Sequence, residues 1–136
     1  MKTRIILLFM VITVILVIGT AYSEEIRTAT VDEILTEARQ NSLKFNRDYM
    51  GKQLIIEGYV GNIGEHISDE TFLPDGYKMR LQPRPGEGTW VGCIFSEENA
   101  DILADLDFGA PIKIKGTFEG KGIVEDVVLV DCEVVE

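Results

Sequence analysis

Residues 53–60 read Gln-Leu-Ile-Ile-Glu-Gly-Tyr-Val, and this stretch decides the class of fold. Its even-numbered aliphatic side chains fall on one side of an extended chain, and its odd-numbered side chains fall on the other. A repeat of two residues is typical of a strand that buries one face. Gly58 and Gly61 predict a bulge or a sharp coil within this first strand.

Four later stretches continue the same alternation, which predicts strands over residues 77–82, 90–95, 111–118 and 123–134. The residues expected to point inward are Met79 and Leu81, then Val91, Cys93 and Phe95, then Ile112, Ile114, Gly116 and Phe118, and finally Val128, Val130, Cys132 and Val134. Turn-forming residues separate the strands: a polar loop at 64–76, a Pro- and Gly-rich turn at 83–88 and a Gly-rich connection at 119–122.

Two helices are expected outside these strands. Thr30-Val-Asp-Glu33 is a capping box, and helical apolar spacing follows it, so we expect a helix from Val31 to about Leu43 after a loose lead-in at 24–29. Ser96-Glu-Glu predicts the start of a short helix that ends at Gly109.

The expected order is therefore helix, three strands, short helix, two strands. This order is typical of a mainly β fold, a five-stranded OB-type Greek-key barrel with a short helix between strands three and four and an N-terminal helix. Residues 24–52 would form the lead-in and helix, and residues 53–136 the barrel. Another α+β roll with the same elements is the alternative.

The first residues have a different character. Lys2 and Arg4 precede an apolar run at 5–18, and Ala21-Tyr-Ser23 offers a small-x-small cleavage site. These features predict a signal peptide at 1–23 and an exported protein, in the periplasm, outside the cell or on the outer face of the membrane. The apolar run is shorter than the about 20 residues of a membrane span. An uncleaved anchor over residues 5–22 is the alternative.

The charge balance is strongly acidic. The chain has 23 acidic and 13 basic residues, a formal net charge of −10, and loss of residues 1–23 would remove only basic groups. Such a body repels phosphate backbones and acidic lipid surfaces. Binding to bulk nucleic acid or to an acidic membrane surface is therefore disfavoured.

Several blocks resemble the tRNA-anticodon-like OB-fold family. They are Asn41 with Tyr49–Val60, Val91–Phe95, Leu106–Gly116 and Leu129–Cys132, and the resemblance covers about residues 40–134. These blocks consist of apolar alternation and glycines, so they specify the barrel better than a ligand. The family includes small exported bacterial proteins of unknown role, and its fold alone does not give the function.

Strands three and five are neighbours in such a barrel, which makes Cys93 and Cys132 candidates for a disulfide. The bridge would contribute on the order of 3–4 kcal/mol to stability. The alternative is two buried thiols that act as small hydrophobic groups.

No constellation for catalysis is evident. His66 is the only histidine, and no second histidine or redox motif accompanies it, so it is read as a solvated loop residue. His66, Asp69, Glu70 and Asp75 do not follow a calcium-loop spacing, and Asp101, Asp105 and Asp107 are read as a solvated acidic face. We therefore expect no metal site, no cofactor and no enzymatic activity.

A binding face is the remaining candidate, because OB domains use strands two and three with the adjacent loops. The candidate ligand-binding residues are Tyr77, Lys78, Arg80, Arg84, Trp90, Lys113 and Lys115. Aromatic and basic groups together would suit a short single-stranded nucleic acid, an anionic sugar or an acidic peptide. The alternative is that Trp90 caps the barrel and the basic residues are ordinary exposed strand residues.

Three hypotheses of function follow. The first is an exported, non-catalytic binding module with an unknown ligand, which would place Trp90 beside Arg80. The second is an envelope protein-interaction domain, which would expose the helix face at Ile34, Leu35 and Ala38. The third is a binder of single-stranded nucleic acid or oligosaccharide, whose affinity for nucleic acid would fall steeply with salt.

Overall fold

The computed structural model describes residues 25–66, 75–122 and 124–135. The strands are β1 (Arg27–Thr30), β2 (Gln53–His66), β3 (Gly76–Gln82), β4 (Val91–Phe95), β5 (Pro111–Gly120) and β6 (Val128–Val135). The helices are α2 (Val31–Gln40), α3 (Ser42–Tyr49), the 3-10 turn η1 (Glu97–Asn99) and α4 (Ala100–Ala104). The expected signal peptide, and Asp69 and Glu70 of the expected polar loop, lie outside the described residues. Within the described ranges, no helix has the length and apolar character that crossing a membrane requires.

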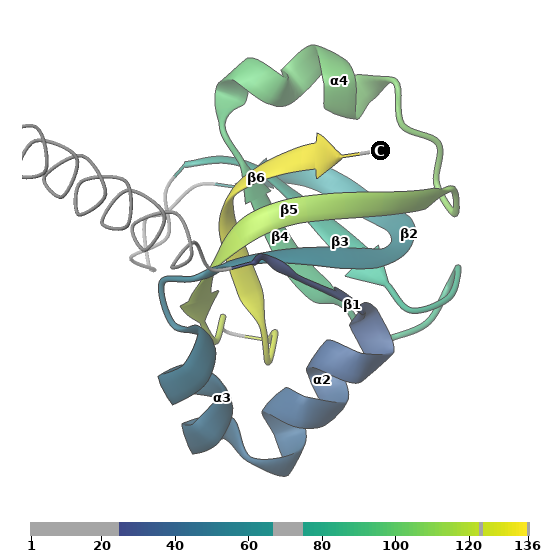
Figure 1. Cartoon of the computed structure of the whole chain (residues 1–136). Helices are drawn as coiled ribbons and strands as arrows, with labels where there is room; N and C mark the ends of the chain where they lie inside the picture. The colour runs from purple at the N-terminus through teal and green to yellow at the C-terminus, as the bar shows by residue number, and fades with distance from the viewer. Residues whose placement is uncertain (1–24, 67–74, 123, 136) are drawn as a thin grey trace, which may run out of the picture.

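Strands β2 to β6 close into a five-stranded mixed barrel, which confirms the predicted OB-type fold (Figure 1). The strand order is β1-β2-β3-β4-β6-β5, and pairing of β2 with β5 closes the ring. All barrel pairings are antiparallel except that of β4 with β6, which is parallel and consists of Gly92 with Val128 and Cys93 with Leu129.

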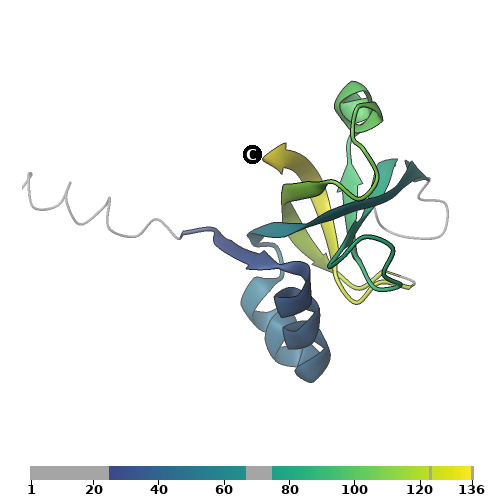
Figure 2. The same ribbon diagram turned by 90° about the vertical axis from the view of Figure 1, so that its right-hand side faces the viewer.

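Helices close both ends of this barrel. Helices α2 and α3 lie at one end and α4 lies at the other, in both views of the ribbon (Figures 1 and 2). The apolar side chains of Ile34, Phe45 and Leu103 join one continuous core with the inward residues of the strands. The ring of Phe45 meets Phe118 of β5 edge-on, with ring centroids 5.0 Å apart. Side chains therefore fill the barrel interior, as expected for a small barrel.

The lead-in expected at 24–29 is wrong, because Arg27–Thr30 forms β1, parallel to Leu54–Glu57 of β2. Only Ala29 of this strand is buried, so four residues give no readable alternation. The two terminal guanidinium nitrogens of Arg27 each donate to the Glu37 carboxylate at 2.6 Å, and Nη1 also donates to the Tyr49 hydroxyl at 2.7 Å. These bonds join β1 to both N-terminal helices and hold the pKa of Glu37 below its usual range.

The first helix begins as predicted, since the Thr30 hydroxyl accepts the amide of Glu33 at 3.3 Å. It ends at Gln40 rather than near Leu43, and α3 follows at once. The side chain of Asn41 accepts the amide of Lys44 at 3.1 Å. This N-cap starts a second helix that hydrophobic periodicity alone did not reveal.

Strand β2 runs further than predicted, because its last residues, up to His66, pair with β3 in the part expected to be loop. His66 is therefore a strand residue rather than a loop residue. The predicted irregularity after Gly58 is confirmed by a register shift between Val60 and Ile63.

Strand β6 differs from the prediction in its starting residue and in its regularity. It begins at Val128 rather than at 123, and residues 124–127 before it do not belong to a strand. Asp131 has a φ of 49°, and Asp131 and Cys132 together oppose Gly116 of β5. This is a bulge, and a bulge reverses the alternation beyond it.

The bulge explains which residues of β6 point inward. Leu129 and Cys132 belong to the barrel core, whereas Val128 and Val130 pack with Ile94 in a separate cluster. The predicted single face of Val128, Val130, Cys132 and Val134 is therefore wrong. A Cβ at Gly116 would lie 2.7 Å from the Cys132 sulfur, so the bulge requires glycine opposite it.

Candidate ligand-binding face

Arg80, on the outer surface of β3, lies beside Trp90, which directly precedes β4. Met79 and Leu81 point into the barrel, so Lys78 and Arg80 point out of it. The Arg80 guanidinium carbon lies 4.2 Å from the centroid of the Trp90 ring. This is well within the about 6 Å of a cation–π contact. The predicted neighbourhood of these two side chains is confirmed.

Glu125 enters this face from the loop between β5 and β6. Its Oε1 forms an ion pair with the Lys78 ammonium and accepts the Trp90 indole N–H at 3.3 Å. Gly92 of β4 leaves room for the side chains of Glu125 and Lys78, because a Cβ at this position would lie 3.3 Å from a carbon of each. The Glu125 side chain is only 1% exposed.

Backbone bonds hold the Glu125 loop, here residues 121–122 and 124–127, against the barrel. The Gly92 amide donates to the Val127 carbonyl at 3.1 Å, and the Gly122 amide donates to the Glu125 carbonyl at 3.0 Å. A Cβ at Gly122 would collide with Oε2 of Glu125, so glycine is required above the carboxylate. That oxygen is buried and has no hydrogen-bond partner within the described part of the chain.

The charge of Glu125 follows from opposing effects. Burial alone would raise its pKa, but the hydrogen bond and charge of Lys78, with the Trp90 indole N–H, outweigh burial and hold the pKa below its usual range. Glu125 is therefore a buried carboxylate anion at neutral pH. Sequence reasoning missed it, because residues 124–127 were assigned to a strand and no pattern marks an acid as buried.

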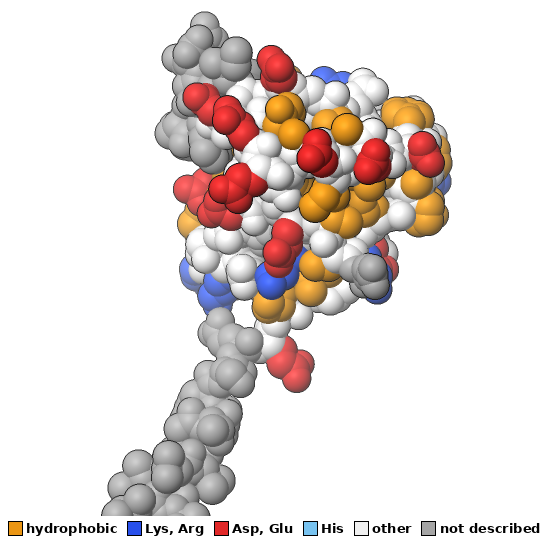
Figure 3. Space-filling view, turned by 90° about the horizontal axis from the view of Figure 1, so that it is seen from above, with side chains coloured by type: hydrophobic (Ala, Val, Ile, Leu, Met, Phe, Trp, Pro, Cys, Tyr) orange, Lys and Arg blue, Asp and Glu red, His pale blue; other side chains and the backbone are white. Residues whose placement is uncertain are grey.

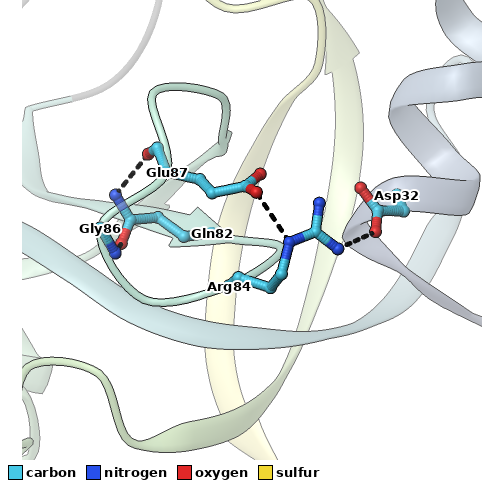
Figure 4. Close-up of polar contacts among 5 residues, drawn as sticks. All are labelled: Asp32, Gln82, Arg84, Gly86 and Glu87. Atoms are coloured by element: carbon cyan, nitrogen blue, oxygen red, sulfur yellow. Dashed lines mark hydrogen bonds and ion pairs between the residues drawn. The ribbon is translucent and has the colours of Figure 1, made fainter.

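Arg84 is placed in a different network, in the turn between β3 and β4 (Figure 4). Its guanidinium donates to Glu87 at 2.7 Å and to Asp32, at the start of α2, at 3.1 Å. The side chain of Gln82 donates to the Glu87 carbonyl and accepts the Gly86 amide. Arg84 therefore fastens this turn to α2 rather than joining Arg80 and Trp90.

Three further candidate residues lie elsewhere. Tyr77 has the same orientation as Met79 and packs partly against the barrel core, so it does not share the outer face of Lys78. Lys113 and Lys115 lie on β5, where they form ion pairs with Glu57 at 3.3 Å and Glu133 at 3.1 Å. Of the seven candidates, Lys78, Arg80 and Trp90 lie together on one face.

Cys93 and Cys132 are both buried thiols that contact each other inside the barrel. Burial, with the hydrogen bond to Cys93, raises the pKa of the Cys132 thiol. Their contact is compatible with the disulfide, which stays a prediction. Across residues 25–66, 75–122 and 124–135, no three His, Cys, Asp or Glu side chains are grouped to hold a metal ion.

A separate apolar groove of about 680 Å³ lies beside the start of α2, the start of β5 and the end of β6. Val31, Tyr59 and Ile112 line it, and the Glu57–Lys113 pair lies at its edge. Seen from the α4 end, acidic side chains are spread among hydrophobic ones, and basic side chains are sparse (Figure 3). This end of the molecule is therefore unsuited to a polyanion.

A family model, tRNA_anti-like, matches residues 1–134. The chain belongs to this family. Among solved structures, a "putative nucleic acid-binding lipoprotein" from Klebsiella pneumoniae is similar, with a TM-score of 0.66, 18% identity, and coverage of 82% of this chain and 92% of that chain. At this level of identity, the likeness shows that the two proteins share a fold.

Two weaker structural matches accompany it. An OBody bound to hen egg-white lysozyme gives a TM-score of 0.47 at 15% identity, covering 65% of this chain and 86% of that chain. A replication factor A related protein from Methanobacterium thermoautotrophicum gives 0.41 at 14% identity, covering 64% and 84%. No curated protein matches the sequence.

The Arg80–Trp90 face lies on the part of the barrel that tRNA_anti-like and other OB folds use for binding. OB barrels bind ligands on their second and third strands and on the loops beside them. Those strands are β3 and β4 here, and the Glu125 loop is the connection between the last two barrel strands. The clustered residues therefore lie where this fold provides a binding surface.

Proposed function

We propose that this protein is an exported, non-catalytic OB-fold binding module whose ligand lies on the Arg80–Trp90 face. The observation that carries the proposal is the Arg80 guanidinium held 4.2 Å from the Trp90 ring on the outer surface of β3 and β4. An aromatic ring beside a cation suits a ligand that presents a ring of its own. The exported location rests on the signal-peptide pattern at 1–23.

The proposal of a binding role draws on the relatives as well. The Klebsiella neighbour is named for binding rather than for a reaction, and its description as a lipoprotein agrees with an envelope location. His66 lies at the end of β2, on a different part of the barrel from Trp90. These points favour recognition over chemistry.

The N-terminal helix does not favour the protein-interaction alternative. Ile34, Leu35 and Ala38, which that alternative would expose, are at most 5% exposed and pack into the barrel core. The apolar face of α2 is therefore already covered.

Trp90 is the only tryptophan of the chain, so its fluorescence reports directly on this face. We expect a saturable change in emission when the purified protein is titrated with an uncharged hexasaccharide or with a thymidine oligonucleotide. By calorimetry, Trp90→Ala should weaken binding about 10- to 100-fold, because stacking on an aromatic side chain contributes about 1–3 kcal/mol.

Trp90→Phe is the matched control, since it keeps a ring and should retain most of the affinity. Tyr59→Ala, in the apolar groove, should leave binding unchanged. Undiminished binding by Trp90→Ala would show that the ligand lies elsewhere.

A further inference from the structure

The Glu125 carboxylate occupies the place on this face where an anionic ligand group would meet Lys78. We infer that Glu125 acts as an internal counter-anion, which makes the Arg80–Trp90 face select an uncharged, hydroxyl-rich ligand, an oligosaccharide, and reject the phosphodiester chain of a nucleic acid. The inference rests on the proposed function, because it names the ligand class of the same face.

The first step concerns the cations that a phosphate would need. The Lys78 ammonium is paired with Glu125, and two of the three guanidinium nitrogens of Arg84, Nε and Nη1, are bonded to Glu87 and Asp32. Arg80 is the one member of this group held by a ring rather than by a carboxylate. Nucleic-acid affinity comes largely from several Lys and Arg side chains that neutralise successive phosphates. For Lys78 and Arg84, that neutralisation is already provided from within the chain.

The Glu125 carboxylate would also repel an anionic ligand. A phosphate placed against Lys78 would also lie beside the buried Glu125 carboxylate, and two like charges at such a distance repel each other strongly in a partly desolvated site. To bind there, the phosphate would have to displace Glu125 and leave a buried carboxylate without its cation. An uncharged ligand avoids both costs.

The third step concerns what the face offers instead. Oε2 of Glu125 is an acceptor that finds no donor among the described residues, although it is fully buried. An unpaired buried oxygen costs about 1–3 kcal/mol or more, and a donor that reaches it recovers part of this energy. Sugar hydroxyls are donors, whereas the phosphodiester groups of a nucleic acid are only acceptors.

The fourth step concerns access to that oxygen. Gly122 covers Oε2, and Gly120 at the start of the same connection has a φ of 116°, a conformation that favours glycine. A loop with glycines on either side of Lys121 can change its backbone angles at low cost. A hydroxyl can reach Oε2 when Gly122 moves away from it, at the cost of the Gly122–Glu125 backbone hydrogen bond, while the sugar ring lies against Trp90.

The test uses the full protein and two defined probes, the uncharged sugar chitohexaose and a thymidine oligonucleotide. The wild type should bind chitohexaose more tightly than the oligonucleotide at physiological salt. Glu125→Gln removes the carboxylate charge and releases Lys78. It should raise oligonucleotide affinity about tenfold and lower chitohexaose affinity about tenfold, since charged hydrogen bonds are the stronger ones.

Glu133→Gln is the matched control, because it removes the same charge from an exposed pair with Lys115 on another part of the barrel. It should change neither affinity by more than about twofold. If Glu125→Gln folds poorly by circular dichroism, the double variant Lys78→Gln with Glu125→Gln removes the pair together. That variant should lose the wild-type preference for the sugar.

The outcomes separate this inference from the proposed function. Tight oligonucleotide binding by the wild type that quenches Trp90, unchanged in Glu125→Gln, would overturn the inference and leave the binding face standing. No Trp90 response to either probe, in wild type or in Glu125→Gln, would overturn the proposed face itself.

Discussion

Two Lys–Glu pairs on opposite parts of the barrel have the same chemistry and different surroundings. On the β3–β4 side, Lys78 is 24% exposed and Glu125 is 1% exposed. On β5 and β6, Lys115 is 28% exposed and Glu133 is 58% exposed. Because the two lysines are almost equally exposed, the burial of the acid is what distinguishes the pairs.

This difference shows that an ion pair has to be judged by its more buried member. A buried carboxylate depends on its cation, because removal of one partner leaves an uncompensated charge away from water. An exposed carboxylate is solvated with or without its cation, so its pair contributes little. The buried pair also occupies a candidate binding face, whereas the exposed pair joins neighbouring strands.

The largest effect should come from truncating each lysine. We expect Lys78→Ala to lower the free energy of unfolding by about 2–3 kcal/mol, less than for a fully buried pair because Lys78 is partly exposed. Lys115→Ala should cost less than about 1 kcal/mol. Urea unfolding at neutral pH measures both, and equal losses would remove the distinction drawn here.

A smaller effect should appear on acidification. The pKa of Glu125 is lowered in the folded protein, so its stabilising contribution is fully present at pH values above the pKa of the unfolded chain and is lost as the pH falls through the folded pKa. Glu125→Gln should therefore show a weaker loss of stability with acid than Glu133→Gln does. Unfolding curves recorded from pH 7 downward measure the slopes, and parallel slopes would contradict the assignment.

The smallest effect should be the response to salt. At molar salt the Debye length is about 3 Å, which screens exposed pairs more than buried ones. The cost of Lys115→Ala should shrink by a few tenths of a kcal/mol, and the cost of Lys78→Ala should change proportionately less. The same urea experiments at low and high sodium chloride sharpen the comparison, and a larger salt effect on Lys78→Ala would break it.

The sequence predicts the barrel well because its long strands bury one face each. Leu54, Ile56 and Ile114 alternate with exposed residues, and this alternation is a direct consequence of burial on one side. Strand β1 escapes because it has four residues and one buried side chain. The bulge at Asp131 escapes because alternation presumes a regular strand, whereas a left-handed residue interrupts it.

The site is predictable only in part. Arg80 lies on β3 and Trp90 directly precedes β4, so the predicted pairing of these two strands is enough to bring the side chains near each other. Tyr77 could have been excluded from the sequence, because it precedes the inward Met79 by one full repeat. The loop position of Glu125 could not be found, since neither composition nor periodicity shows which acid among many turns inward.

The short pairing of β4 with β6 has a consequence for how the barrel opens. Two residue pairs join these strands, fewer than at any other described strand pairing. The Glu125 loop is bonded to the same edge, because the Gly92 amide of β4 donates to the Val127 carbonyl. The β4–β6 contact is therefore the weakest strand pairing of the barrel, and its amide protons should exchange with solvent sooner than those between β2 and β5. A ligand that moves Glu125 outward would pull on the contact between β4 and β6. A disulfide between Cys93 and Cys132 would join these two strands covalently and oppose their separation.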